Sequence, residues 1–114
     1  MKKLNNAKGS ILTVREELRR ESADTARLLS RSVERVASVD HLPCREYGAE
    51  VAHQQVLAEE LLFLQHCRSA LERAVDRGGS RLVWHWQTGG RTEVRFRREN
   101  HHLTMTVRQL PDAA

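Results

Sequence analysis

The side chains of this sequence that could bind a metal ion are six histidines and two cysteines. His41 and Cys44 form a His-x-x-Cys pair in a predicted loop, and three more lie on the helix expected after it: His53, His66 and Cys67. Zinc needs four convergent ligands at about 2.0–2.3 Å. Because His66 and Cys67 are adjacent, their side chains diverge by about 100° on a helix. The pattern is weak, and we expect a loop thiol and solvent-facing imidazoles, with no metal and no cofactor.

Cys44 is also the best candidate for a nucleophile. Arg45 and His41 create an electropositive setting that could lower the pKa of its thiol. A catalytic thiol further needs an oriented base and an oxyanion site in a pocket, and no such motif is present. The glycine pairs Gly78-Gly79 and Gly89-Gly90 fit a helix stop and a hairpin turn better than a phosphate loop. We therefore expect a protein that is not an enzyme, with two free thiols.

Charge is distributed unevenly along the chain, which has 19 basic and 15 acidic residues and a net charge of +4. The first 13 residues hold three lysines and no acid, and residues 78–114 hold six arginines against three acids. Residues 48–77 between them hold three arginines against five acids. A basic surface can bind nucleic acid or neutralise the protein's own acidic helix. The candidate contacts to nucleic acid are Lys2, Lys3, Arg95, Arg97 and Arg108.

Two long helices are predicted to position these residues. Thr13 and Glu16 have the spacing of a capping box before a helix over residues 14–37, whose apolar residues recur at steps of three and four. Pro43 lies in the loop that follows. The second helix, over residues 49–77, has two apolar stripes and ends at Gly78.

Beyond residue 78 the period of the apolar residues changes to two, which predicts strands over residues 81–87, 92–98 and 102–109. One sheet face is apolar and is expected to cover the second helix: Leu82, Trp84, Trp86, Val94, Phe96, Leu103, Met105 and Val107. The predicted fold class is α+β, with an N-terminal helical hairpin followed by a three-stranded antiparallel β-meander packed on the second helix. We expect one domain over residues 14–110, a basic polar tail over 1–13 and a second tail over 111–114.

The lengths of these elements do not match. The second helix is about 42 Å long, whereas a seven-residue strand spans about 23 Å, so the sheet cannot cover it. Unless the helix breaks near Gln65, its second stripe must be covered by the N-terminal tail, by a second copy in a homodimer or by a heterologous protein partner, and we favour the last two. The residues proposed to bind that partner are Val56, Phe63, Cys67 and Ala70. The first and third strands add two exposed sheet edges.

We therefore predict a small protein-interaction protein, such as an adaptor, regulator or assembly subunit, that acts through the helix stripe and a sheet edge. The alternative is a nucleic-acid-binding protein that uses the outer sheet face, although Trp84, Trp86 and Phe96 alternate onto the opposite face. The basic residues Lys2 and Lys3 at the N-terminus resemble the start of a signal peptide, but no apolar stretch follows them. We expect a cytoplasmic protein without a membrane segment.

Overall fold

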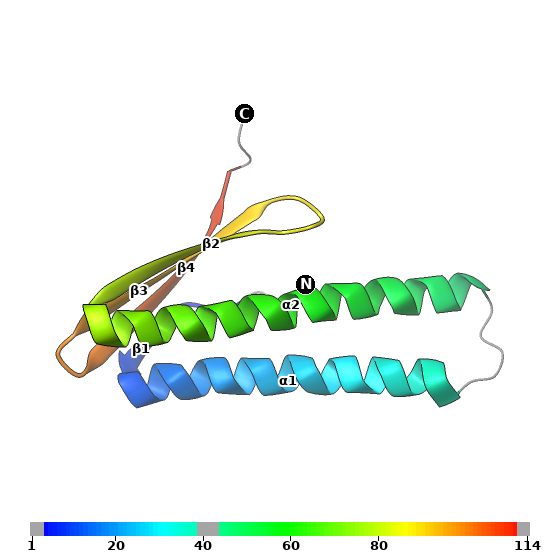
Figure 1. Cartoon of the computed structure of the whole chain (residues 1–114), viewed down its shortest axis with the longest axis horizontal. Coiled ribbons are helices and arrows are strands. Elements are labelled where there is room, and N and C mark those ends of the chain that lie inside the picture. The colour runs from blue at the N-terminus through cyan, green and yellow to red at the C-terminus, as the bar shows by residue number, and fades with distance from the viewer. Residues whose placement is uncertain (1–3, 39–43, 112–114) are drawn as a thin grey trace.

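The computed structural model describes residues 4–38 and 44–111 and has an α+β fold, as predicted. A hairpin of two long helices packs against one antiparallel sheet, and the sheet covers only one end of the hairpin (Figure 1). The elements in chain order are β1 (Ala7–Ser10), α1 (Ile11–Ser38), α2 (Cys44–Arg77), β2 (Gly79–His85), β3 (Arg91–Glu99) and β4 (His102–Leu110). Over the described residues, neither helix has a stretch apolar enough and long enough to cross a membrane.

The helices begin earlier than predicted. The N-cap of α1 is Ser10, whose hydroxyl oxygen accepts a 3.1 Å hydrogen bond from the amide of Thr13. The predicted capping box at Thr13 is therefore wrong, and Glu16 pairs with Arg19 one turn later instead. Helix α2 begins at Cys44 and runs through Gly48 without a break to Arg77. The alternative of a helix broken near Gln65 is thus wrong as well.

The sheet has four strands in the order β1-β4-β3-β2, one more than predicted. The added strand is β1, which pairs antiparallel with β4 and places Ala7 opposite Met105. Residues 7–13 are therefore strand and helix, so the prediction of a polar tail over 1–13 is wrong for that segment. The third predicted strand, β4, is consequently not an open edge along its first half. The amide of Val107 in its second half donates a 2.7 Å hydrogen bond to the Asn6 side chain.

Glycines set the connections around β2. Gly78, with φ of 94°, ends α2, and β2 starts at the next residue. Strand β2, predicted to end at Gln87, ends at His85, because Trp86 already closes the turn with backbone hydrogen bonds to Gly89 and Gly90. Since β2 departs directly from the C-terminal end of α2, the sheet must cover that end of the hairpin.

The core lies between the sheet and the hairpin, and the predicted inner face of the sheet is confirmed. All eight of its apolar residues belong to the core or pack against it. Phe63 of α2 is 4% exposed, and its ring centroid lies 5.7 Å from that of Trp84 and 5.0 Å from that of Trp86. The indole nitrogen of Trp86 donates a 2.8 Å hydrogen bond to the hydroxyl of Thr92. The two indoles therefore face the helices.

Candidate functional site

The candidate site is the part of the hairpin that extends past the sheet, which we call the arm. It comprises residues 26–37 of α1 and 46–62 of α2, and it meets the sheet at Glu59, whose carboxylate accepts hydrogen bonds from the Trp84 indole and the Gln87 amide. Figure 1 shows both helices continuing well beyond the last strand. The longest strands, with nine residues, span about 30 Å and α2, with 34 residues, about 51 Å, so roughly two fifths of α2 is left without a sheet above it.

The seam between the two helices of the arm is thin. Ser32 of α1 is buried in it, its hydroxyl donates a hydrogen bond to the Glu50 carboxylate, and its carbonyl accepts a 3.3 Å hydrogen bond from Gln54. Leu57 is the apolar residue of α2 that is buried there. Small and polar side chains thus occupy much of the seam, and several large apolar residues of the arm point outward instead.

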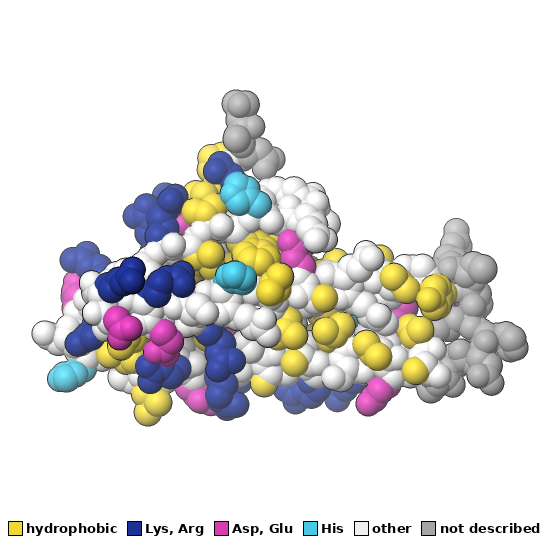
Figure 2. All heavy atoms as spheres, in the orientation of Figure 1, with side chains coloured by type: hydrophobic (Ala, Val, Ile, Leu, Met, Phe, Trp, Pro, Cys, Tyr) yellow, Lys and Arg dark blue, Asp and Glu magenta, His cyan; other side chains and the backbone are white. Residues whose placement is uncertain are grey.

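The outer surface of the arm is unusually apolar. Residues 51–58 contain no charged side chain, although 30% of the chain is charged. Tyr47 is 51% exposed, Val33 50% and Leu62 48%, and Leu28 and Val56 are exposed as well. In Figure 2 hydrophobic side chains lie over both helices of the arm, whereas Lys and Arg gather at the sheet end and along one edge. A helix that is apolar around its circumference is normally covered on more than one side.

One side of the arm combines these residues into a continuous surface, which we call the arm face. On α2 the residues of this face lie on one side of the helix from Tyr47 to Leu62, and steps of three and four residues along the same side lead on to Glu72. On α1 the residues from Val33 back to Arg15 at helical spacing also lie on one side of the helix. The ion pair of 2.8 Å between Arg15 and Glu72 shows that these two sides face the same way in the hairpin. The members of the arm face are Ala26, Leu29, Val33, Ala37, Tyr47, Val51, Ala58 and Leu62.

Three of the four predicted partner-binding residues are not on the surface. Phe63, Cys67 and Ala70 lie beneath the sheet in the protein's own core, and burial raises the pKa of the Cys67 thiol to about 12. Their assignment to a partner surface is therefore wrong, because the sheet covers the C-terminal half of α2, where these residues lie. Val56, the fourth, is exposed on the arm. The arm-face residues of α2, Tyr47, Val51, Ala58 and Leu62, were missed because they belong to neither of the two apolar stripes predicted for that helix.

The described residues contain no cluster that could hold a metal ion. His41 lies outside the described residues, and so does the side chain of Cys44, so the structure places neither of these candidates. His53 is exposed, and His66 packs its ring on Trp84 with 5.3 Å between centroids. The structure thus assigns His66 to packing.

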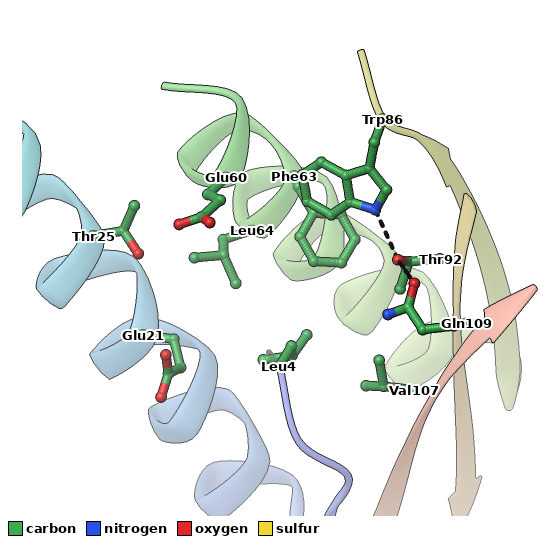
Figure 3. A pocket seen from close by; sticks show the side chains of 10 residues that line it. All are labelled: Leu4, Glu21, Thr25, Glu60, Phe63, Leu64, Trp86, Thr92, Val107 and Gln109. Carbon is green, nitrogen blue, oxygen red and sulfur yellow. Dashed lines mark hydrogen bonds between the residues drawn. The ribbon is translucent and has the colours of Figure 1, made fainter. Parts of the chain in front are cut away.

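A small cavity lies where the sheet meets the hairpin (Figure 3). Its volume is about 30 Å³, and its lining includes the carboxylates Glu21 and Glu60. On its other side Thr92 accepts the hydrogen bond from Trp86 and donates one of 2.9 Å to Gln109. A cavity of this volume has room for about one water molecule, whereas ligand pockets usually exceed about 300 Å³. We therefore assign this polar chain to structure.

The outer face of the sheet carries the predicted nucleic-acid candidates Arg95, Arg97 and Arg108, while Lys2 and Lys3 lie outside the described residues. At its centre is Glu93, whose side chain is 3% exposed and receives three arginines. Arg81 lies at 2.6 Å, Arg95 at 3.1 Å and Arg108 at 3.2 Å from its oxygens. The hydrogen bond from Arg81, with the charges of the other two arginines, lowers the pKa of Glu93. Glu93 is the cross-strand partner of Arg108, so the cluster was missed because it follows from the strand register.

Comparison with known proteins points to no family. No protein-family model matches the chain, and no curated protein or solved structure matches it either. Function must therefore be argued from two surfaces, the arm face and the outer face of the sheet.

Proposed function

We propose that this protein is a non-enzymatic interaction protein that forms a homodimer through the arm face. The observation that carries the proposal is the composition of the arm: two helices, a thin seam, and half-exposed Val33, Tyr47 and Leu62 around a stretch without charge. Contiguous exposed apolar patches are rare on monomeric proteins and, where they are large, mark interaction sites.

A second copy is the partner that fits this surface best. In a two-fold dimer the same patch meets itself, so like charges must not face each other. The arm face has no charged member, so its self-association meets no such repulsion. Two hairpins packed face to face make a four-helix bundle, in which the thin seam of each arm receives a second layer of side chains.

The size of the arm supports a dimer of moderate affinity. Residues 46–62 of α2 span about 25 Å, and two helices side by side are about 20 Å wide, so one side of the arm covers roughly 500 Å². A standard interface buries about 800 Å² per partner, and isolated apolar patches on monomers rarely exceed a few hundred Å². We expect dissociation in the micromolar range.

The test is the molar mass of variants measured by light scattering. Wild type at about 100 µM is expected at twice the chain mass of 13.1 kDa, and Val33→Glu and Leu62→Glu at the mass of one chain. Both residues are half-exposed, so the substitutions leave the core of each chain intact. The matched control is Leu12→Glu, since Leu12 is an exposed leucine of α1 outside the arm, and this variant should stay dimeric.

Two outcomes would contradict the homodimer. Wild type that is monomeric and stays dissolved at this concentration would show that the arm needs no cover. Glutamate variants that remain dimeric while folded would place the interface elsewhere, for example at the β2 edge. A heterologous protein that binds the arm face of a monomer would keep the interaction function but replace the partner.

A further inference from the structure

The outer face of the sheet holds the positive charge of the molecule. Its side chains alternate away from the helices, and the paired registers of the four strands define them. The cations of this outer sheet face are Lys8, Arg81, Arg91, Arg95, Arg97 and Arg108, and its acids are Glu93 and Glu99. Six cations minus two acids leave +4, which equals the net charge of the whole chain. The other 13 basic and 13 acidic residues are equal in number.

Glu93 orders these cations more than it neutralises them. One carboxylate receives Arg81, Arg95 and Arg108, which leaves two positive charges in the cluster. The side chains of the three arginines remain 54%, 59% and 62% exposed, while Glu93 is buried under them. Ordered guanidinium groups lose less conformational freedom when they bind an anion than free side chains do. The cluster is therefore prepared for an external anion.

We propose that the outer sheet face binds the phosphate backbone of duplex nucleic acid without sequence preference. Along β3 the outward residues stand about 6.8 Å apart, three of these five are arginines (Arg91, Arg95 and Arg97), and neighbouring strands add cations about 4.8 Å to the side. A duplex carries one negative charge per about 1.7 Å of axis, so a duplex laid on this face brings several phosphates within reach of its cations. Thr104 and Thr106, which lie on the same face, add hydroxyl donors suited to phosphate oxygens.

The composition of this face favours nucleic acid over other anionic partners. Among its described residues the only large apolar side chains are Val83 and Leu110, and its only rings are the imidazoles of His85 and His102, with no Phe, Tyr or Trp. Protein interfaces usually need buried aromatic or apolar anchors, and membrane surfaces need apolar groups that enter the lipid. Trp84 and Trp86 point to the core, so bases of a single strand have no indole to stack on and meet only the smaller rings of His85 and His102. A duplex, whose bases are hidden, needs no such ring.

This inference does not depend on the homodimer. The helices cover the inner face of the sheet, and the arm lies beyond the sheet, so the outer sheet face is accessible in a monomer (Figure 1). A monomeric protein that binds duplex DNA would refute the proposed assembly and leave this inference intact.

The test measures binding to a fluorescently labelled DNA duplex of mixed sequence over a range of salt concentrations. The variant Arg95→Gln/Arg108→Gln removes two cations of the face, and the control Arg20→Gln/Arg31→Gln removes two exposed cations of α1. Each lost phosphate contact reduces the slope of log K against log salt by about 0.9. The face variant should therefore lose a slope of about 1.8 and bind roughly 60-fold more weakly at 0.1 M salt. The control should change affinity less than threefold.

A second variant covers the case in which the double substitution disturbs the sheet. Thr106→Glu keeps all four side chains of the Glu93 cluster, places a negative charge beside Arg95, and should weaken binding at least tenfold. Equal losses in the face and control variants would overturn the proposal, as would binding that does not depend on salt. Binding to vesicles rich in an anionic lipid or to polyglutamate, with none to the duplex, would also overturn it.

Discussion

Phe63 was predicted to bind a partner but lies in the core, and its replacement by alanine tests whether the sheet covers it. Its ring is 4% exposed and packs against both indoles at 5.7 and 5.0 Å. Replacing a buried phenylalanine by alanine costs about 3–5 kcal/mol, because the transfer free energy is lost and a cavity remains. We therefore expect Phe63→Ala to lower the free energy of unfolding by about 4 kcal/mol.

A loss of this size is a large part of the 5–15 kcal/mol that holds an ordinary domain together. The expected fall in melting temperature is roughly 15 °C for a chain of this length. Urea unfolding followed by tryptophan emission, at one fixed protein concentration, measures the change. Leu12→Ala is the control: its side chain is 69% exposed, and its loss should be below about 0.5 kcal/mol. Phe63→Ala that loses less than 1 kcal/mol yet no longer assembles would refute the placement of the sheet over Phe63.

Three further predictions concern single side chains. Ser10→Ala removes the N-cap of α1 and should cost about 1 kcal/mol, measured by thermal unfolding. The pKa of Glu93 is lowered in the folded state, so its contribution to stability is complete above its ordinary pKa of 4.5 and is lost as pH falls through the lowered value. The difference in urea midpoint between wild type and Glu93→Gln should therefore shrink from pH 7 to pH 2.5. In a Cys44→Ser background the buried Cys67 thiol should react with a thiol reagent only as fast as the protein unfolds, and immediate reaction would contradict its burial.

The local patterns of the sequence predicted most of the fold. The alternation from Leu82 to Val107 identified three strands and the face that is buried, because one side of an antiparallel sheet must be apolar. The long apolar periodicity of residues 49–77 likewise identified the second helix. Strand β1 was missed since Ala7–Ser10 has residues of low strand propensity and pairs with residues 102–105, far away in the chain.

The sequence indicated that part of α2 extends beyond the sheet, but it did not indicate which residues form that part. Comparing helix and strand lengths correctly indicated that part of α2 lies beyond the sheet. Which part depends on the connection at Gly78, a single residue that places β2 over the C-terminal half of α2. Phe63, Cys67 and Ala70 were therefore assigned to the wrong side of that boundary, while Val56 was assigned correctly to the exposed part. The Glu93 cluster depends on cross-strand register, which alternation along one strand does not specify.

The arrangement of the two surfaces has a consequence for assembly. The arm face and the outer sheet face use different residues of different layers, so the proposed dimer leaves both sheets open. Each dimer would then present two basic faces, one from each chain.

Sedimentation equilibrium of the wild-type protein between about 1 and 100 µM tests the central claim most directly. An arm face that pairs with itself predicts a mass that rises with concentration from the 13.1 kDa of one chain to twice that value. It also predicts that Leu62→Glu remains at 13.1 kDa throughout. A wild-type mass of 13.1 kDa over the whole range would contradict the proposed function.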